Sequence, residues 1–212
     1  MGRGASTSVC GMTSINFITL EVTDVKAAEK FYADAFGLTT QLRMHASDTA
    51  TTGFRGFTIS LIVSQPAAVR SLFDSAVAAG ATVLKPVDKS IWGVGGVLQA
   101  PDGAIWKVAT SAKKDKGPAT RDIDQIVLLL AAEDVGASKK LYVEKGLRLG
   151  KSFGSYVEFA TPGSTVGLGL YKRNALAKDA GLPADGSGSH RLVINGDVES
   201  FTDLDGFVWA TA

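Results

Sequence analysis

Histidine and cysteine are scarce in this chain, and each scarcity excludes a class of site. The 212 residues contain two His and one Cys. A site built on several imidazoles is therefore excluded, and the single Cys10 cannot form an intrachain disulfide. Because the chain makes no demand for an oxidising compartment, we expect a cytoplasmic protein.

An excess of one charge and long apolar runs are also missing. Lys and Arg number 22 against 21 Asp and Glu, whereas a nucleic-acid-binding protein normally carries a basic excess that neutralises phosphates. No apolar run reaches the roughly 18 residues that a membrane span needs. Residues 1–14 lack the apolar core of a secretory signal and are interpreted as a flexible tail, although Gly2 and Ser6 fit the loose N-myristoylation pattern. These features predict a soluble protein without nucleic-acid or membrane partners.

The chain does contain an internal repeat, and this repeat predicts the architecture. Residues 24–32 (DVKAAEKFY) precede Gly37-Leu38, and residues 134–142 (DVGASKKLY) precede Gly146-Leu147. An apolar stretch comes before each block, and the segments 101–106 (PDGAIW) and 204–209 (LDGFVW) match near the two ends. We therefore predict two related halves, residues 15–110 and 123–212, joined by a charged, turn-rich linker at 111–122.

Local signals place helices and strands within each half. Asp24 and Asp134 are typical N-caps, Gly37 is a helix stop, and the segment Pro66–Gly80 has the apolar spacing of a second helix. Strands are expected at residues 15–22, 57–63, 97–99, 105–109, 123–130, 156–160, 166–171 and 190–194. The order predicts an α+β fold with curved sheets and helices packed outside. The second half has no room for a helix between residues 195 and 201, so we interpret it as a trimmed copy that leans on the first half. Whether two chains pair as a homodimer to complete it is left open.

These segments together resemble a known family. A strand, then Val22-Thr23-Asp24, a helix ending Phe31-Tyr32 and the turn Phe36-Gly37-Leu38 resemble the opening of a βαβββ module. Residues 101–107 (PDGAIWK) are similar to that module's last hairpin, and residues 90–96 (SIWGVGG) to the segment before it. The family is the glyoxalase/bleomycin-resistance/dioxygenase group of the vicinal-oxygen-chelate superfamily. The resemblance implies paired βαβββ modules that form curved mixed sheets.

The same resemblance implies positions for a divalent metal, which family enzymes hold with His, Gln and Glu side chains and use to chelate two adjacent substrate oxygens. By this analogy the first ligand lies seven residues before the capping Asp, at Phe17 and at Val127, or at Gln125 in another register. The last ligand lies four residues after the glycine of the Asp-Gly turn, at Lys107 and Ala210. Because a protonated Lys offers no lone pair, most of the family's ligands are predicted to be lost.

The favoured hypothesis is a metal-free protein that binds a small organic molecule in an aromatic-lined cup, with no cofactor. Its predicted ligand-binding residues are Phe17, Trp92, Gln125, Tyr171 and His190, whereas Trp106 and Trp209 are expected in the core. The alternative is a lyase, isomerase or dioxygenase that holds one divalent metal ion with Gln125 and His190. Two neutral ligands hold such an ion weakly, and whether the protein is an enzyme is left open. A third hypothesis, an interaction protein, predicts a filled cup.

Overall fold

The computed structural model describes residues 14–212 of the chain. The predictions about Cys10 and about Gly2 and Ser6 therefore lie outside the described residues. Within them, no helix is both long enough and apolar enough to cross a membrane.

Residues 57–172 form an eight-stranded sheet with the strand order β5-β6-β7-β4-β8-β11-β10-β9. Its strands are β4 (Phe57–Ile62), β5 (Thr82–Ser90), β6 (Gly93–Gln99), β7 (Ile105–Thr110), β8 (Gln125–Ala132), β9 (Arg148–Phe153), β10 (Tyr156–Ala160) and β11 (Val166–Lys172). With α2 (Pro66–Ala78) and α3 (Val135–Glu144) they make two βαβββ units, β4-α2-β5-β6-β7 and β8-α3-β9-β10-β11. The opening strands β4 and β8 pair antiparallel, so the two units meet in the middle of the sheet.

The two ends of the chain build a second sheet of five strands, in the order β14-β15-β13-β1-β2. Its strands are β1 (Ile15–Val22), β2 (Leu42–Ala46), β13 (Leu192–Gly196), β14 (Phe201–Thr202) and β15 (Val208–Thr211). β1 pairs parallel with β2 and antiparallel with β13. Each sheet therefore takes strands from both sides of the 111–122 segment. A separate two-stranded ribbon joins β3 (Thr52–Gly53) to β12 (Gly186–Ser187).

The helices α1, α2 and α3 begin where the sequence predicts them. In α1 (Val25–Phe36) the Asp24 carboxylate accepts a hydrogen bond from the Ala27 N–H at 3.0 Å. Gly37 ends this helix in the left-handed conformation, with φ 71°, which a side chain would disfavour. Asp134 caps α3 in the same way as Asp24 caps α1, and Pro66 occupies the first turn of α2.

A buried tyrosine ties the first helix of each half to an Asp-Gly turn. The Tyr32 hydroxyl donates to the Asp102 carboxylate at 2.6 Å and accepts from Trp106 Nε1 at 3.3 Å. The second half repeats the network with Tyr142, Asp203 and Trp209. Both Trp side chains are buried, as expected.

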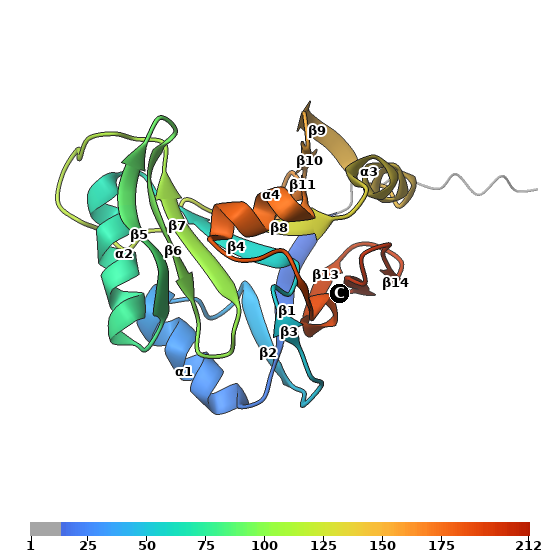
Figure 1. The fold of residues 1–212 in the computed structure, drawn as a ribbon, viewed down its shortest axis with the longest axis horizontal. Coiled ribbons are helices and arrows are strands. Elements are labelled where there is room, and N and C mark those ends of the chain that lie inside the picture. The colour runs from blue at the N-terminus through green and yellow to red at the C-terminus, as the bar shows by residue number, and fades with distance from the viewer. Residues whose placement is uncertain (1–13) are drawn as a thin grey trace, which may run out of the picture.

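A fourth helix, α4 (Arg173–Ala180), was not predicted. Its Leu176 and Ala177 pack on Leu129 and Ala131 of β8. The alternate residues Leu128 and Leu130 belong to the main core, which also takes in residues of α2 and α3. Successive strand residues point to opposite faces, so α4 lies on the opposite face from α2 and α3 and crosses in front of β4 and β8 in Figure 1. We call this surface the α4 face.

One strand prediction needs correction. His190 does not begin a strand, because it lies in the 3-10 turn η1 (Ser189–Arg191) and β13 starts at Leu192. Gly188, with φ 134°, and the hydrogen bond from the Arg191 N–H to the Gly188 carbonyl at 3.0 Å turn the chain there.

Candidate functional site on the eight-stranded sheet

One row of register-matched residues crosses the α4 face from strand β5 to strand β11. Directly paired residues on neighbouring strands point to the same face of a sheet. In order across six strands, the row is Lys85, Val97, Lys107, Ser60, Val127 and Gly167. Two predicted metal positions, Lys107 and Val127, therefore lie in one row with Ser60 between them.

An ion pair links this row to α4. Lys107 Nζ lies 2.7 Å from Asp179 Oδ2. Lys85 Nζ donates to the main-chain carbonyls of Lys178 and Asp179, at 2.8 and 2.6 Å. Carbonyls at a helix C-terminus lack partners within the helix, and a lysine amine satisfies them. Two lysines of the sheet thus hold the C-terminal end of α4 over the face.

A pocket on this face opens at that ion pair. It has a volume of about 670 Å³ and includes Lys107, Lys85 and Asp179 in its lining. Further walls come from Pro86, from the segments 88–90 and 92–97, from Ile62 and from residues 109–111. We call it the Lys107 pocket. Its volume lies within the range of ligand sites, roughly 300–1,000 Å³.

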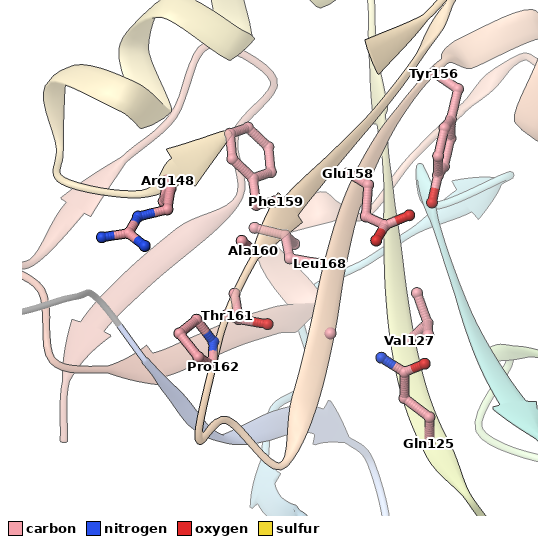
Figure 2. A pocket seen from close by; sticks show the side chains of 11 residues that line it. Gln125, Val127, Arg148, Tyr156, Glu158, Phe159, Ala160, Thr161, Pro162 and Leu168 are labelled. Carbon is pink, nitrogen blue, oxygen red and sulfur yellow. The ribbon is translucent and has the colours of Figure 1, made fainter. Parts of the chain in front are cut away.

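The second pocket, of about 500 Å³, lies toward β10, and we call it the Glu158 pocket. In Figure 2 the Glu158 carboxylate, the Tyr156 hydroxyl and the Gln125 amide turn toward a shared space, with Arg148 set apart from them. Gly167 lines the floor of this pocket without a side chain. A Cβ at this position would lie 2.9 Å from Gln125 Nε2 and would fill part of the space. Burial, and then the charge of Glu158, raise the pKa of Tyr156 above its ordinary value.

Two further predicted metal positions, Phe17 and Ala210, lie on the other sheet. There, a register row joins Phe17 of β1, Asn195 of β13 and Ala210 of β15. The Arg43 guanidinium stacks over the Phe17 ring at 3.5 Å. The buried Asn195 amide donates to Thr19 Oγ1 at 3.0 Å. In this row the Asn195 amide is the one side chain that could coordinate a metal ion.

The donors present do not fit the metal that the fold family implies. Neither register row contains a carboxylate or an imidazole, and the Lys107 ammonium has no lone pair. Across residues 14–212, no group of three or more His, Cys, Asp or Glu is arranged to hold a metal ion. Gln125 and Glu158 share a pocket, but zinc sites use three or four protein ligands.

The five predicted ligand-binding residues do not share one cup. Gln125 lines the Glu158 pocket, and Trp92, a residue that is 83 % exposed, lies at the lip of the Lys107 pocket. Tyr171 packs against the cluster around α4, and its ring meets Tyr156 edge to face at 6.0 Å. Phe17 belongs to the five-stranded sheet, and His190 to the turn that leads into it.

Sequence reasoning missed four residues that define these sites. Ser60 on β4 and Asn195 on β13 each pair directly with a predicted metal position, Lys107 and Phe17, but the repeat did not single out these two strands. Asp179 was missed because α4 was not predicted. Glu158 stands in the alternating segment Tyr156–Ala160, where its placement on the Tyr156 side could have been inferred from strand periodicity.

The comparisons with known proteins show likeness in structure only. No family model matches the chain, and no curated protein matches it. Glyoxalase I from Zea mays is similar with a TM-score of 0.63 and 14 % identity, covering 94 % of this chain and 92 % of that one. A putative dioxygenase from Bacillus subtilis subsp. subtilis str. 168 is similar with a TM-score of 0.53 and 12 % identity, covering 91 % of this chain and 71 % of that one.

The expected fold is therefore confirmed. The chain has the α+β architecture of curved, open sheets found in glyoxalase-like vicinal-oxygen-chelate structures, as the motifs of the sequence predicted. At such low identity the likeness concerns the fold, because one fold supports many unrelated functions.

Proposed function

We propose that the protein binds a small organic molecule on the α4 face of its eight-stranded sheet and needs no metal ion to do so. The observation that carries the proposal is the ion pair between Lys107 and Asp179, at 2.7 Å. It stands where the fold family would place a metal ligand, and it opens onto the Lys107 pocket. The Lys107 ammonium at this point has no lone pair to offer a metal ion, and its N–H groups can donate hydrogen bonds to polar groups of a ligand.

The shape and lining of the Lys107 pocket also support binding. Its floor is largely apolar, because Gly95, Gly96, Val97 and Ala109 contribute to it. The Trp92 indole stands at the lip and offers a flat surface. Apolar walls with a few placed polar groups are typical of small-molecule sites.

Isothermal titration with Zn²⁺, Mn²⁺ and Ni²⁺ tests the metal-free part of the proposal. We expect no stoichiometric binding by the native chain, and thermal shifts with a library of small organic molecules should identify ligands in metal-free buffer. A tight site for one ion per chain would overturn the metal-free proposal.

A metal-dependent enzyme is the second candidate, and one observation favours it. Glu158 lies beside Gln125 in the second pocket, so a carboxylate and an amide face the same space. This set replaces the pair of Gln125 and His190, because His190 does not line that pocket. Should an ion bind in the titration above, Glu158→Gln must abolish its binding and His190→Ala must leave it unchanged. Ion binding that survives Glu158→Gln, or that is lost in His190→Ala, would show that the ion does not bind in this pocket.

A further inference from the structure

The C-terminal end of α4 occupies the polar end of the Lys107 pocket in the manner of a bound ligand. Asp179 places its carboxylate on Lys107 and its main-chain carbonyl on Lys85. The two lysines come from strands β7 and β5, in one register row with Val97 between them. The sheet therefore directs two ammonium groups at one acidic residue that lies on another element.

The ion pair can be exchanged at small cost. The side chains of Lys107 and Asp179 are 31 % and 42 % exposed. Partly exposed pairs of this kind contribute little to stability, because water screens the attraction and ordering the two side chains costs entropy. The carboxylate of a ligand that reached Lys107 would therefore compete with an Asp179 carboxylate that is only weakly held there.

The charges around the pocket favour a negatively charged ligand. Three lysines line it, Lys85, Lys89 and Lys107, against two aspartates, Asp88 and Asp179. If a ligand carboxylate replaces that of Asp179, the ammonium groups stay paired and Asp179, already partly exposed, turns to water. The apolar floor and the Trp92 indole then face the rest of the ligand.

We propose that the ligand is an organic anion with a flat apolar body, and that its carboxylate displaces Asp179 from Lys107. The inference rests on the proposed function, since it names the ligand class of the same pocket. Asp179 acts in it as an internal competitor, so removing its charge strengthens binding rather than weakening it. A purely structural Asp179 would have the opposite effect, because its loss would loosen α4 and the wall of the pocket.

The test compares three probes of one shape: 2-naphthoate, neutral 2-naphthamide and cationic 2-naphthylmethylammonium. Affinities are measured by isothermal titration on the full chain and on Asp179→Asn, Lys107→Gln and Asp88→Asn. We expect the native chain to prefer naphthoate. Asp179→Asn should tighten naphthoate binding by about fivefold, the most that a half-exposed pair is worth, and should leave naphthamide unchanged. Lys107→Gln should remove the preference for the anion.

Asp88→Asn is the matched control, because it removes the same charge from the lining of the same pocket. It should change naphthoate affinity by much less than Asp179→Asn, since the carboxylate that pairs with Lys107 is that of Asp179. Weaker or equal naphthoate binding by Asp179→Asn, or an equal effect of Asp88→Asn, would overturn the inference. If Asp179→Asn fails to fold, the loss or survival of anion preference in Lys107→Gln decides. Equal binding of all three probes would refute the anion and spare the proposed function. Binding of none of them would overturn the inference, and the library screen in metal-free buffer would then decide the proposed function.

Discussion

Two buried phenols, Tyr32 and Tyr142, link distant parts of the chain at the level of single side chains. Each hydroxyl donates to an aspartate of an Asp-Gly turn and accepts from an indole. Burial first, and then the neighbouring carboxylate, raise the pKa of both tyrosines well above 10.0. A charged phenolate would lose its hydrogen bond to the carboxylate and be repelled by it.

Alkaline titration should reveal this arrangement. Above pH 10.0 the unfolded chain releases the two phenolic protons while the folded chain keeps them. The contribution of these tyrosines is therefore complete below that pH and is lost as pH rises further. We expect the phenolate absorbance of Tyr32 and Tyr142 to appear together with the loss of far-ultraviolet circular dichroism. In Tyr32→Phe and Tyr142→Phe the unfolding-linked absorbance should fall by one phenol each. Reversible ionisation of either tyrosine in the native chain would contradict the burial that we describe.

The sequence predicted the residues of these networks only in part. The two Trp residues were expected in the core because they stand at matched places after an Asp-Gly turn. By the same match Asp102 corresponds to Asp205, and the turn hydrogen bonds agree with it, yet Tyr142 donates to Asp203. Asp205 instead accepts from the Glu133 N–H and from Ser138 Oγ. A repeat fixes the backbone of the turn, but which of two nearby carboxylates meets a hydroxyl depends on three-dimensional packing.

At the scale of elements, α4 decides how much of the eight-stranded sheet is open. Its buried Leu176 packs with Phe54, Ala131 and Ala177. Leu176→Ala should lower the free energy of unfolding by about 2–5 kcal/mol, because it leaves a cavity between helix and sheet. Asn174→Ala is the control, since that side chain is exposed on the same helix. Urea denaturation measures both, and a loss no greater than that of the control would show that α4 is not packed on the sheet.

The elements that the sequence predicted well are those with strong local signals. Asp24, Gly37 and Asp134 mark helix ends by their own hydrogen bonds or backbone freedom, so α1 and α3 were placed closely. The helix α4 has Lys172 at its N-cap and no capping side chain. It forms because Leu176 and Ala180 find apolar partners on β8 and β6, which are distant in sequence. The candidate site depends on this contact. Of its residues, the sequence therefore singled out Trp92, Lys107, Gln125 and Val127, but neither Asp179 nor Glu158.

At the scale of the whole molecule, the two sheets cross the boundary between the repeated halves. β4 of the first half pairs with β8 of the second, and β1 near the N-terminus pairs with β13 near the C-terminus. Each sheet is therefore held together by contacts between residues that are far apart in the sequence. The repeat gives the order of elements along the chain, whereas strand pairing between the halves makes each sheet depend on both of them.

Separately produced halves test this interleaving. A fragment of residues 1–118 would expose the edges of β4 and β1 that pair with β8 and β13, and a fragment of residues 119–212 would leave β13–β15 without β1. Unpaired edges and lost apolar burial leave too little to offset chain entropy. We expect neither fragment to show a cooperative thermal transition by circular dichroism, whereas the full chain unfolds in one. Mixing the fragments should restore the transition, because every strand then has its partner. Cooperative unfolding of the first fragment alone would mean that β4 and β1 do not require their partners from the second half.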